Sequence, residues 1–445
     1  MEVAVGIDSA DSPYGGCTTH ALYGVFKRLF ARGLIGKLLD YPLLVRLNPA
    51  VPGKTRGNGA VALRFKASER ATLDLLAEEV ASEVMSYVSR VQGDVSKVGV
   101  VITAGNIDRE LYDIYLKALT DFVHLDYVRT VVDHLEGIVL PLGLNKGCVG
   151  ALAAIGWSST RCTYELLIYR HHLNAGRTER SVEVEILRCL DLLPEYTTFC
   201  SYDHESNRAI AVPRGPDPVL LGIRGLDPEK LVNTLNYLRL KEPIEGWMIF
   251  KTNQATGDHM VPRASTELKP FRTGCVAGKV EDVLVIVGGD VLLLVNDGYG
   301  KLKVVVFKET GLAPYAGLLE KGDVVRFCGT IKVWDNLEPV LHAEYLEVLD
   351  LAEKYLTMNP RCPRCGKRLK SAGKRKGYKC PSCGFRSSNL TPEVQILPRE
   401  LSQGVYLPSC ASAKHLSIPK QLPVTKVECV AREPKQVSDF YNIQS

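Results

Sequence analysis

Four cysteines near the C-terminal end constrain the fold of this chain more than any other feature. Cys362 and Cys365 form one Cys-Pro-x-Cys-Gly pair, Cys380 and Cys383 form a second, and 14 residues separate the two pairs. This spacing is close to the pattern that places four thiolates around one tetrahedral zinc ion. A redox site would instead need a single Cys-x-x-Cys at the start of a helix in a thioredoxin-like unit. The sequence therefore predicts a zinc ribbon that binds Zn²⁺.

The same segment is strongly basic. Residues 361–386 contain ten Lys or Arg and no Asp or Glu, whereas the whole chain, with 55 basic and 50 acidic residues, has a formal net charge of only +5. The total charge identifies no partner, but the local excess favours contact with nucleic-acid phosphates over a merely solvated basic face. Tyr378 and Phe385 lie among these charges and are candidates for stacking on bases.

The remaining nine of the 13 cysteines occur singly along the chain. The N-terminus carries acids where a signal peptide carries basic residues, and no apolar stretch approaches the roughly 18–20 residues that cross a bilayer. We therefore expect a cytoplasmic protein without a membrane span. Because thiols stay reduced in that compartment, we expect the nine single cysteines to be small buried apolar residues rather than ligands.

Length and hydrophobic periodicity predict a modular α+β protein. At roughly 150 residues per domain, 445 residues correspond to about three domains, and the pattern along the chain divides it into four. We expect an α/β domain over 1–135, a ferredoxin-like domain over 136–262, an OB-fold over 263–352, and the zinc ribbon with a C-terminal region over 353–445.

Two of these segments depend on particular patterns. In the second segment we expect a helix at 228–238 and strands at 164–169, 182–189, 219–224 and 247–252. In the third segment, five strand-like runs and a short helical stretch before Lys321 favour an OB-fold, with another small β-barrel as the alternative.

The first predicted strand ends in a loop that carries two carboxylates and a glycine-rich turn. Asp8 and Asp11 lie three residues apart, and the turn then leads into a predicted helix through Gly15, Gly16, Cys17, Thr18 and Thr19. Carboxylates at a strand end suit Mg²⁺, and backbone N–H groups at a helix N-terminus suit phosphate. The pattern predicts a site for a magnesium nucleotide; in the alternative, Asp11 and Ser12 only cap and turn the chain.

A second glycine-rich loop is cationic. It contains Lys54, Arg56, Gly57, Asn58 and Gly59. This loop is not a P-loop, because the pattern requires a glycine where Asn48 stands and because a strand, not a helix, follows it. We expect it to bind a triphosphate or RNA phosphate, with a solvated hairpin as the alternative.

Taken in order, these motifs resemble those of the archaeal tRNA(Ile) 2-agmatinylcytidine synthetases. The resemblance covers nearly the whole chain. It is carried by GIDSADSPYGGCTT, RLNPAVPGKTRGNGAVAL, GALAAIG, TYELLIYR, PDPVLLGIRG, FKTNQATGDH, the barrel, the ribbon and AKHLSIP. The resemblance implies a kinase-like catalytic domain over 1–135 and a tRNA-binding region over 353–445.

The resemblance also implies a reaction. ATP phosphorylates O2 of the wobble cytidine in the isoleucine tRNA whose anticodon is CAU, and the primary amine of agmatine then displaces that phosphate at C2. ATP ends as AMP and two phosphates, and the product, 2-agmatinylcytidine, reads the codon AUA. Phosphoryl transfer needs a metal and cationic clamps, which Asp8, Asp11 and Lys54 with Arg56 would supply.

The resemblance assigns roles to individual residues as well. Thr18 matches the threonine that this family phosphorylates on itself. For the agmatine guanidinium, Glu165 or Asp203 is a candidate acidic partner, with backbone carbonyls as the alternative. The chain departs from the family where Ser9 and Ala10 replace an Asp and a Thr, and where Arg161 and Cys162 replace Asp-His. The first departure removes one possible metal carboxylate.

A function of another class also fits the C-terminal half. OB-folds with zinc ribbons commonly bind single-stranded nucleic acid without catalysis. That hypothesis leaves the first 260 residues without a role, so we favour the synthetase.

Overall fold

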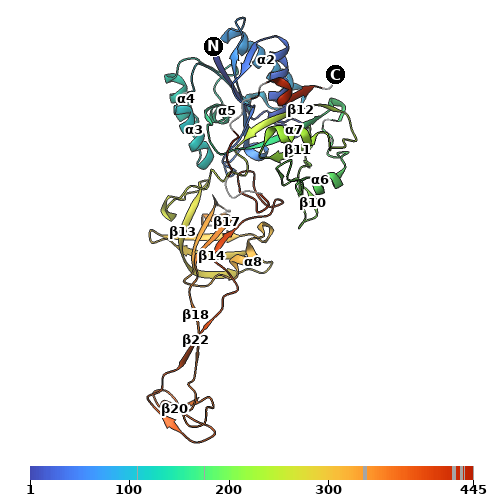
Figure 1. Cartoon of the computed structure of the whole chain (residues 1–445). Coiled ribbons are helices and arrows are strands. Elements are labelled where there is room, and N and C mark those ends of the chain that lie inside the picture. The colour runs from blue at the N-terminus through green and yellow to red at the C-terminus, as the bar shows by residue number, and fades with distance from the viewer. Residues whose placement is uncertain are drawn as a thin grey trace.

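The computed structural model describes residues 1–107, 109–174, 176–333, 338–422, 427–430, 434 and 436–443. Figure 1 shows an α/β body that contains both termini, a β-barrel next to it, and a slender extension that ends in the ribbon. The predicted α+β class with an OB-fold and a zinc ribbon is confirmed. No helix among the described residues is long and apolar enough to cross a membrane.

The α/β body is built on one sheet of 11 strands. Its main order is β6-β5-β1-β4-β3-β12-β7-β11-β8, with β2 on β4 and β24 on β12. The strands of the first part are β1 (Glu2–Asp8), β2 (Ile35–Leu38), β3 (Leu43–Arg46), β4 (Gly59–Ala67), β5 (Gly99–Ala104) and β6 (Ile138–Val139). Those of the second part are β7 (Thr163–Arg170), β8 (Thr198–Phe199), β11 (Val219–Gly225) and β12 (Ile244–Thr252).

The two parts of this sheet meet at a parallel pair. Strand β3 pairs with β12, so Leu43 and Leu44 lie opposite Lys251 and Thr252. The other neighbours in the main path are antiparallel. Because the hydrophobic core continues across this pair, residues from both parts can face one cavity.

Helices cover the sheet. They are α1 (Thr18–Ala31), α2 (Leu73–Arg90), α3 (Arg109–Thr120), α4 (Leu125–His134), α5 (Gly147–Gly156), α6 (Val184–Leu190) and α7 (Pro228–Thr234). The Thr72 side chain caps α2, and Asp227 caps α7. Helix α5 consists mostly of small apolar residues and lies very close to β1, since a methyl group at Gly6 would be 2.4 Å from the Ala151 carbonyl oxygen.

One predicted strand is wrong. Residues 182–189 were expected to form a strand, but Val184–Leu190 form helix α6. The alternation of Val182, Val184 and Ile186 resembles a strand pattern, yet the buried residues are Leu187 and Leu190, which share one helical face. Tertiary packing of this pair overrides the local alternation.

The barrel contains β13 (Thr273–Val285), β14 (Val291–Asn296), β15 (Lys301–Val306), β16 (Val324–Lys332) and β17 (Val340–Asp350). A parallel pairing between β15 and β17 closes it. The short helix α8 (Ala313–Ala316) lies between the third and fourth strands, as expected for an OB-fold.

The ribbon stands at the end of a two-stranded stalk. Strands β18 (Lys354–Met358) and β22 (Glu393–Leu397) form the stalk, and β19 (Lys370–Ser371), β20 (Tyr378–Lys379) and β21 (Arg386–Ser387) form the ribbon sheet. In Figure 1 the stalk carries the ribbon away from the α/β body.

After the ribbon, the chain returns to the other parts of the molecule. Strand β23 (Gly404–Tyr406) pairs with β17 of the barrel, and β24 (Tyr441–Ile443) pairs with β12 of the sheet. Between them, residues 409–417, here called the C-terminal segment, pack against the loop that follows β12.

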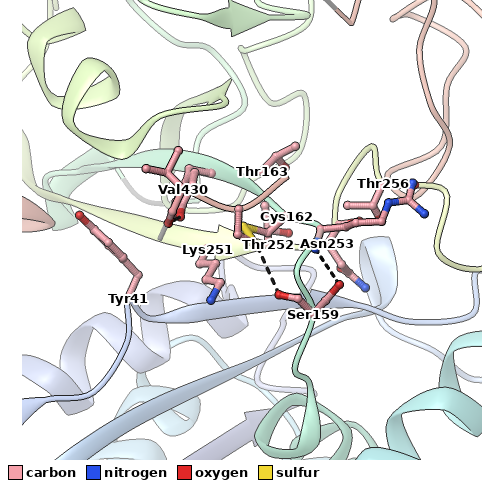
Figure 2. The surroundings of a disulfide bond; sticks show 12 residues. Tyr41, Ser159, Cys162, Thr163, Lys251, Thr252, Asn253, Thr256 and Val430 are labelled. Atoms are coloured by element: carbon pink, nitrogen blue, oxygen red, sulfur yellow. Dashed lines mark hydrogen bonds between the residues drawn. A yellow bond between two sulfur atoms is a disulfide. The ribbon is translucent and has the colours of Figure 1, made fainter. Parts of the chain in front are cut away.

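The expectation of nine reduced single cysteines is wrong for six of them. The disulfides are Cys162–Cys429, Cys200–Cys410 and Cys275–Cys328. Figure 2 shows Cys162 beside Thr163 and Thr252, at the ends of two central strands. The first two bonds join residues 267 and 210 positions apart, so spacing along the chain carried no sign of them. Both tie the returning chain to the α/β body.

Candidate active site

A cavity opens where the N-terminal loop, the β3–β4 loop, strands β7 and β11, and the C-terminal segment meet. The residues that line this central cavity include Asp11, Cys17, Thr18, Thr19, Arg46, Gly57, Gly59, Glu165, Asp217, Arg224 and His415. Six of them come from the predicted nucleotide loops, Arg46 ends β3 between these loops, and the other four come from far along the chain. The fold therefore joins the two glycine-rich loops in one site.

Thr18 and Asp11 form the most closely connected pair in this cavity. The Thr18 hydroxyl donates to Asp11 Oδ2 at 3.1 Å, and the Thr18 N–H donates to Oδ1 at 3.2 Å. The Ala10 N–H donates to the same hydroxyl oxygen at 3.2 Å, which fixes its orientation. A carboxylate within hydrogen-bond distance of a hydroxyl is placed to take its proton during nucleophilic attack.

Asp8 lies on the other side of the same loop. It lines a neighbouring side cavity with residues that include Ser9, Lys54, Asn58, Lys146 and Gly150. Its side chain is buried, and burial together with the nearby Asp11 raises the pKa of Asp8 to about 8. Two neighbouring carboxyl groups of which one is buried form a donor set that suits a divalent cation.

Two arginines flank one buried carboxylate in the central cavity. Arg46 Nη2 lies 3.9 Å from Glu165 Oε2, and Arg224 Nε lies 3.5 Å from Oε1. Gln254 Nε2 also donates to Oε2. Two guanidinium groups share a single carboxylate, so the cluster keeps a positive charge suited to phosphate groups.

The two acids predicted to contact agmatine lie in different surroundings. Glu165 faces the central cavity, between the two arginines. Asp203 is fully buried and does not line that cavity: its oxygens accept the N–H groups of Glu205, Ser206 and Ala411 at 2.8–3.2 Å. Asp203 thus holds the C-terminal segment, and its contact with agmatine remains only a prediction.

In the glycine-rich turn before α1, the backbone N–H groups of Gly15 and Cys17 donate to acceptors within the protein. The Cys17 N–H donates to Tyr87 Oη at 2.9 Å, and the Gly15 N–H to the Ser12 carbonyl at 3.4 Å. Gly15 has φ 126° and packs against the Gly176 backbone, and Gly16 packs against Ser12. Cys17 and Thr19 do line the central cavity, but Gly15 and Gly16 lie outside it.

The cationic loop borders both cavities. Lys54 and Asn58 line the side cavity, and Gly57 and Gly59 line the central one. Gly57 has φ 71°, and a methyl group there would be 2.7 Å from an Arg46 nitrogen. The backbone of Arg56 starts a short 3-10 helix, whereas its side chain lies outside the described part.

Sequence reasoning assigned no role to three side chains of the central cavity: Arg46, Arg224 and His415. Each belongs to a stretch that carries the family resemblance: Arg46 to RLNP, Arg224 to GIRG and His415 to AKHL. These stretches were the signal in the sequence that could have identified the three residues. Their roles were not recognised because they are far apart in the chain.

The four predicted zinc ligands come together in the ribbon. The sulfur atoms of Cys362, Cys365, Cys380 and Cys383 all lie within 4.8 Å of one another. Cys362 and Cys380 are buried, and Cys365 and Cys383 are exposed. Four thiols in this arrangement fit a tetrahedral zinc ion.

Comparisons with known proteins agree with this architecture. Family models match residues 4–140 (TiaS TCKD domain), 145–259 (TiaS FLD domain), 275–349 (OB-fold nucleic acid binding domain) and 359–401 (TiaS C-terminal zinc ribbon domain). The fold and site thus define a multidomain enzyme with nucleic-acid-binding modules. The chain belongs to the TiaS family, the tRNA(Ile) 2-agmatinylcytidine synthetases.

Two relatives support this assignment along nearly the whole chain. The 2-agmatinylcytidine synthetase TiaS of Ignisphaera aggregans is 37% identical and covers 93% of this chain and 92% of its own. That of Thermofilum pendens is 38% identical, with 94% and 95% covered.

Solved structures are similar as well. Apo TiaS and a complex of TiaS with its isoleucine tRNA and ATP each have a TM-score of 0.81 and 30% identity, and each match covers 96% of this chain and 99% of the solved one. A complex of TiaS with the same tRNA, AMPCPP and agmatine has a TM-score of 0.78 at 27% identity, with the same coverage.

Proposed function

We propose that this protein is an ATP-dependent carbon–nitrogen ligase that conjugates agmatine to C2 of the wobble cytidine of the isoleucine tRNA with anticodon CAU, giving 2-agmatinylcytidine. The observation that carries the proposal is the hydrogen-bonded Asp11–Thr18 pair, which lines one cavity together with Arg46 and Arg224. This is a nucleophile with its base beside an anion site, as phosphoryl transfer requires. Nucleic-acid binding without catalysis would not require a hydroxyl group paired with a base in this way.

The nucleotide is ATP, and Asp8 and Asp11 hold the Mg²⁺ that accompanies it. The residues present fit this ion, because Asp8 is buried beside a second carboxyl group and a cation would offset the repulsion between them. When bound, Mg²⁺ neutralises charge on the phosphate oxygens. Lys54 lines the side cavity with Asp8, Arg46 lines the central cavity with Asp11, and both act as cationic clamps.

Thr18 accepts the phosphoryl group first. Asp11 takes the proton of its hydroxyl as the oxygen attacks, over the 3.1 Å hydrogen bond already present. The second phosphoryl acceptor is O2 of the cytidine, which must leave the anticodon stack to enter the cavity.

Agmatine brings a guanidinium and a primary amine. Of its two predicted acidic partners, Glu165 is the one that lines the central cavity, so it is the first to test by substitution. Asp203, which is buried and accepts the Ala411 N–H of the C-terminal segment, is the second candidate to test.

The domains divide the work. Residues 1–135 form the catalytic domain, 136–262 the ferredoxin-like domain, 263–352 the OB-fold, and 353–445 the ribbon and C-terminal region. The basic ribbon binds Zn²⁺ and contacts tRNA phosphates. We place this work in the cytoplasm; disulfides such as the three seen here do occur in intracellular proteins of hyperthermophilic archaea.

One assay tests the proposal. Purified protein, tRNA with a CAU anticodon, labelled agmatine and Mg-ATP should yield labelled tRNA, and Asp8→Ala should abolish labelling while tRNA binding is retained. The exposed Asp133→Ala, on α4, is the matched control and should remain active. Binding of tRNA without any labelling by the folded wild-type protein would instead support the non-catalytic function.

A further inference from the structure

The C-terminal segment brings a histidine into the central cavity. The His415 carbonyl accepts the Ala255 N–H at 2.8 Å, and the Leu416 carbonyl accepts the Gly257 N–H at 2.9 Å. Five residues earlier, Cys410 is joined to Cys200. The backbone of residue 415 is therefore fixed against the loop after β12.

A chain of hydrogen bonds sets which ring nitrogen of His415 carries the proton. A carboxylate only accepts, so Glu165 orients the amide of Gln254 with its NH₂ group toward Oε2. Gln254 Oε1 then lies 2.8 Å from His415 Nδ1, closer than Arg224 Nη2 at 3.4 Å, so the shorter contact decides the tautomer and Oε1 accepts from Nδ1. Nδ1 consequently bears the hydrogen, and Nε2 is left as the unprotonated nitrogen.

The unprotonated Nε2 has access to the reaction space. His415 lines both the central cavity and the adjoining cavity that contains Lys54 and Lys414. Nε2 lies near Gly57, 3.2 Å from where a methyl group there would be. Within the described residues, the polar contacts of the ring at hydrogen-bond distance involve Nδ1 and not Nε2.

The surrounding charges keep the ring neutral. Arg46, burial, Arg224 and Lys54 together hold the pKa of His415 well below its usual range. The other charged groups that line the two cavities it faces are Asp11, Glu165, Arg208, Arg214, Asp217, Glu344 and Lys414. The same positive charges disfavour the ammonium form of a primary amine. An amine that binds here therefore loses its extra proton to solvent and binds in the neutral form.

We propose that His415 is the base that takes a proton from the attacking amine of agmatine. The proposal rests on the proposed function. The amine lone pair forms the N–C2 bond, the C2–O2 bond breaks, and O2 leaves with the phosphoryl group as inorganic phosphate. One N–H proton passes to Nε2 and then to the departing phosphate. A weak base suffices, because the nitrogen becomes far more acidic once it bonds to C2.

The test separates the two halves of the reaction. His415→Ala should still transfer label from γ-labelled ATP to Thr18 within about twofold of wild type. Its turnover number for agmatine conjugation at pH 7 should fall roughly 10²-fold or more, without a matching rise in the KM for agmatine. Added imidazole should restore part of this loss. His134→Ala, at an exposed histidine that ends α4, is the matched control and should match wild type in both assays.

A second variant distinguishes catalysis from support of the fold. His415→Asn keeps a donor for Gln254 but has no base, so it should be as defective in conjugation as His415→Ala. Recovery of conjugation in His415→Asn, loss of Thr18 labelling in His415→Ala, or unchanged conjugation in His415→Ala would each overturn the proposal. Failure of the wild-type protein to use agmatine at all would instead refute the proposed function.

Discussion

A methyl group added at Gly150 would lie 2.0 Å from Oδ2 of Asp8, so α5 approaches the N-terminal loop as closely as a glycine allows. The helix thereby forms one wall of the cavity that Asp8 faces. The Asp8 carboxylate can occupy this position only because residue 150 is a glycine and has no side chain.

Gly150→Ala should therefore displace Asp8 and lower Mg-ATP-dependent labelling of Thr18 by about 10²-fold or more, because misplaced groups lose most of their catalytic effect. Gly317→Ala is the matched control, since its added methyl group would meet nothing closer than 3.4 Å. Phosphorylation of Thr18 with γ-labelled ATP measures the effect. Normal labelling of Thr18 by Gly150→Ala would show that phosphorylation does not require Asp8 at its present position.

Magnesium binding should release protons. The pKa of Asp8, about 8 in the folded protein, means that a cation must displace a proton from this carboxyl at neutral pH. We expect the affinity for Mg²⁺ with ATP to rise up to about tenfold per pH unit until pH 8 and then level off. Titration calorimetry in buffers of different ionisation enthalpy should report about one proton released at pH 7. The same release from Asp8→Asn would contradict this assignment.

The raised pKa of Asp8 also predicts how the stability of the metal-free protein depends on pH. Its folded-state pKa lies above the ordinary value of about 3.9, so the folded protein binds more protons than the unfolded one between about pH 4 and pH 8. The contribution of Asp8 to stability is then full below pH 4 and is lost as the pH rises toward 8. Asp8→Asn should remove this slope in thermal unfolding curves, and an unchanged slope would assign it to another group.

The Cys200–Cys410 disulfide should matter for activity as well as stability. Its removal in Cys200→Ala/Cys410→Ala should lower the free energy of unfolding by about 2–5 kcal/mol and speed hydrogen exchange at the Ala255 amide, which bonds to His415. Agmatine conjugation should fall with it. Cys275→Ala/Cys328→Ala is the control, because that bond lies within the barrel and its loss should leave Ala255 protected.

The ribbon should bind tRNA mainly through phosphates. Replacing the exposed Lys374, Arg375 and Lys376 with Ser should weaken tRNA binding and lower the slope of log Kd against log salt by about 2–3. The exposed Lys37, Lys66 and Arg70, in the α/β body, serve as the control triple. Cys380→Ser/Cys383→Ser should release zinc and weaken binding further. If all these proteins bound tRNA with equal affinity, the ribbon would not be part of the tRNA interface.

Local patterns were enough to predict several features of the structure. The cysteine spacing predicted the four-thiol cluster, and the five strand-like runs predicted the barrel, because both signals lie within short stretches of chain. The loop after β1 was correctly located, and so was the cationic loop before β4. Residues 182–189 were predicted wrongly, since burial of Leu187 and Leu190 in the hydrophobic core decides their conformation.

The sequence by itself determined the modules, the four-cysteine cluster and the two glycine-rich loops, since each depends on residues close in the chain. Only the tertiary structure decided which distant side chains share the cavity. The parallel pairing of β3 with β12 joins the two parts of the sheet, and two disulfides hold the returning chain against it. Arg46, Arg224 and His415 meet there because burial and strand pairing act over hundreds of residues, a distance at which periodicity and spacing carry no information.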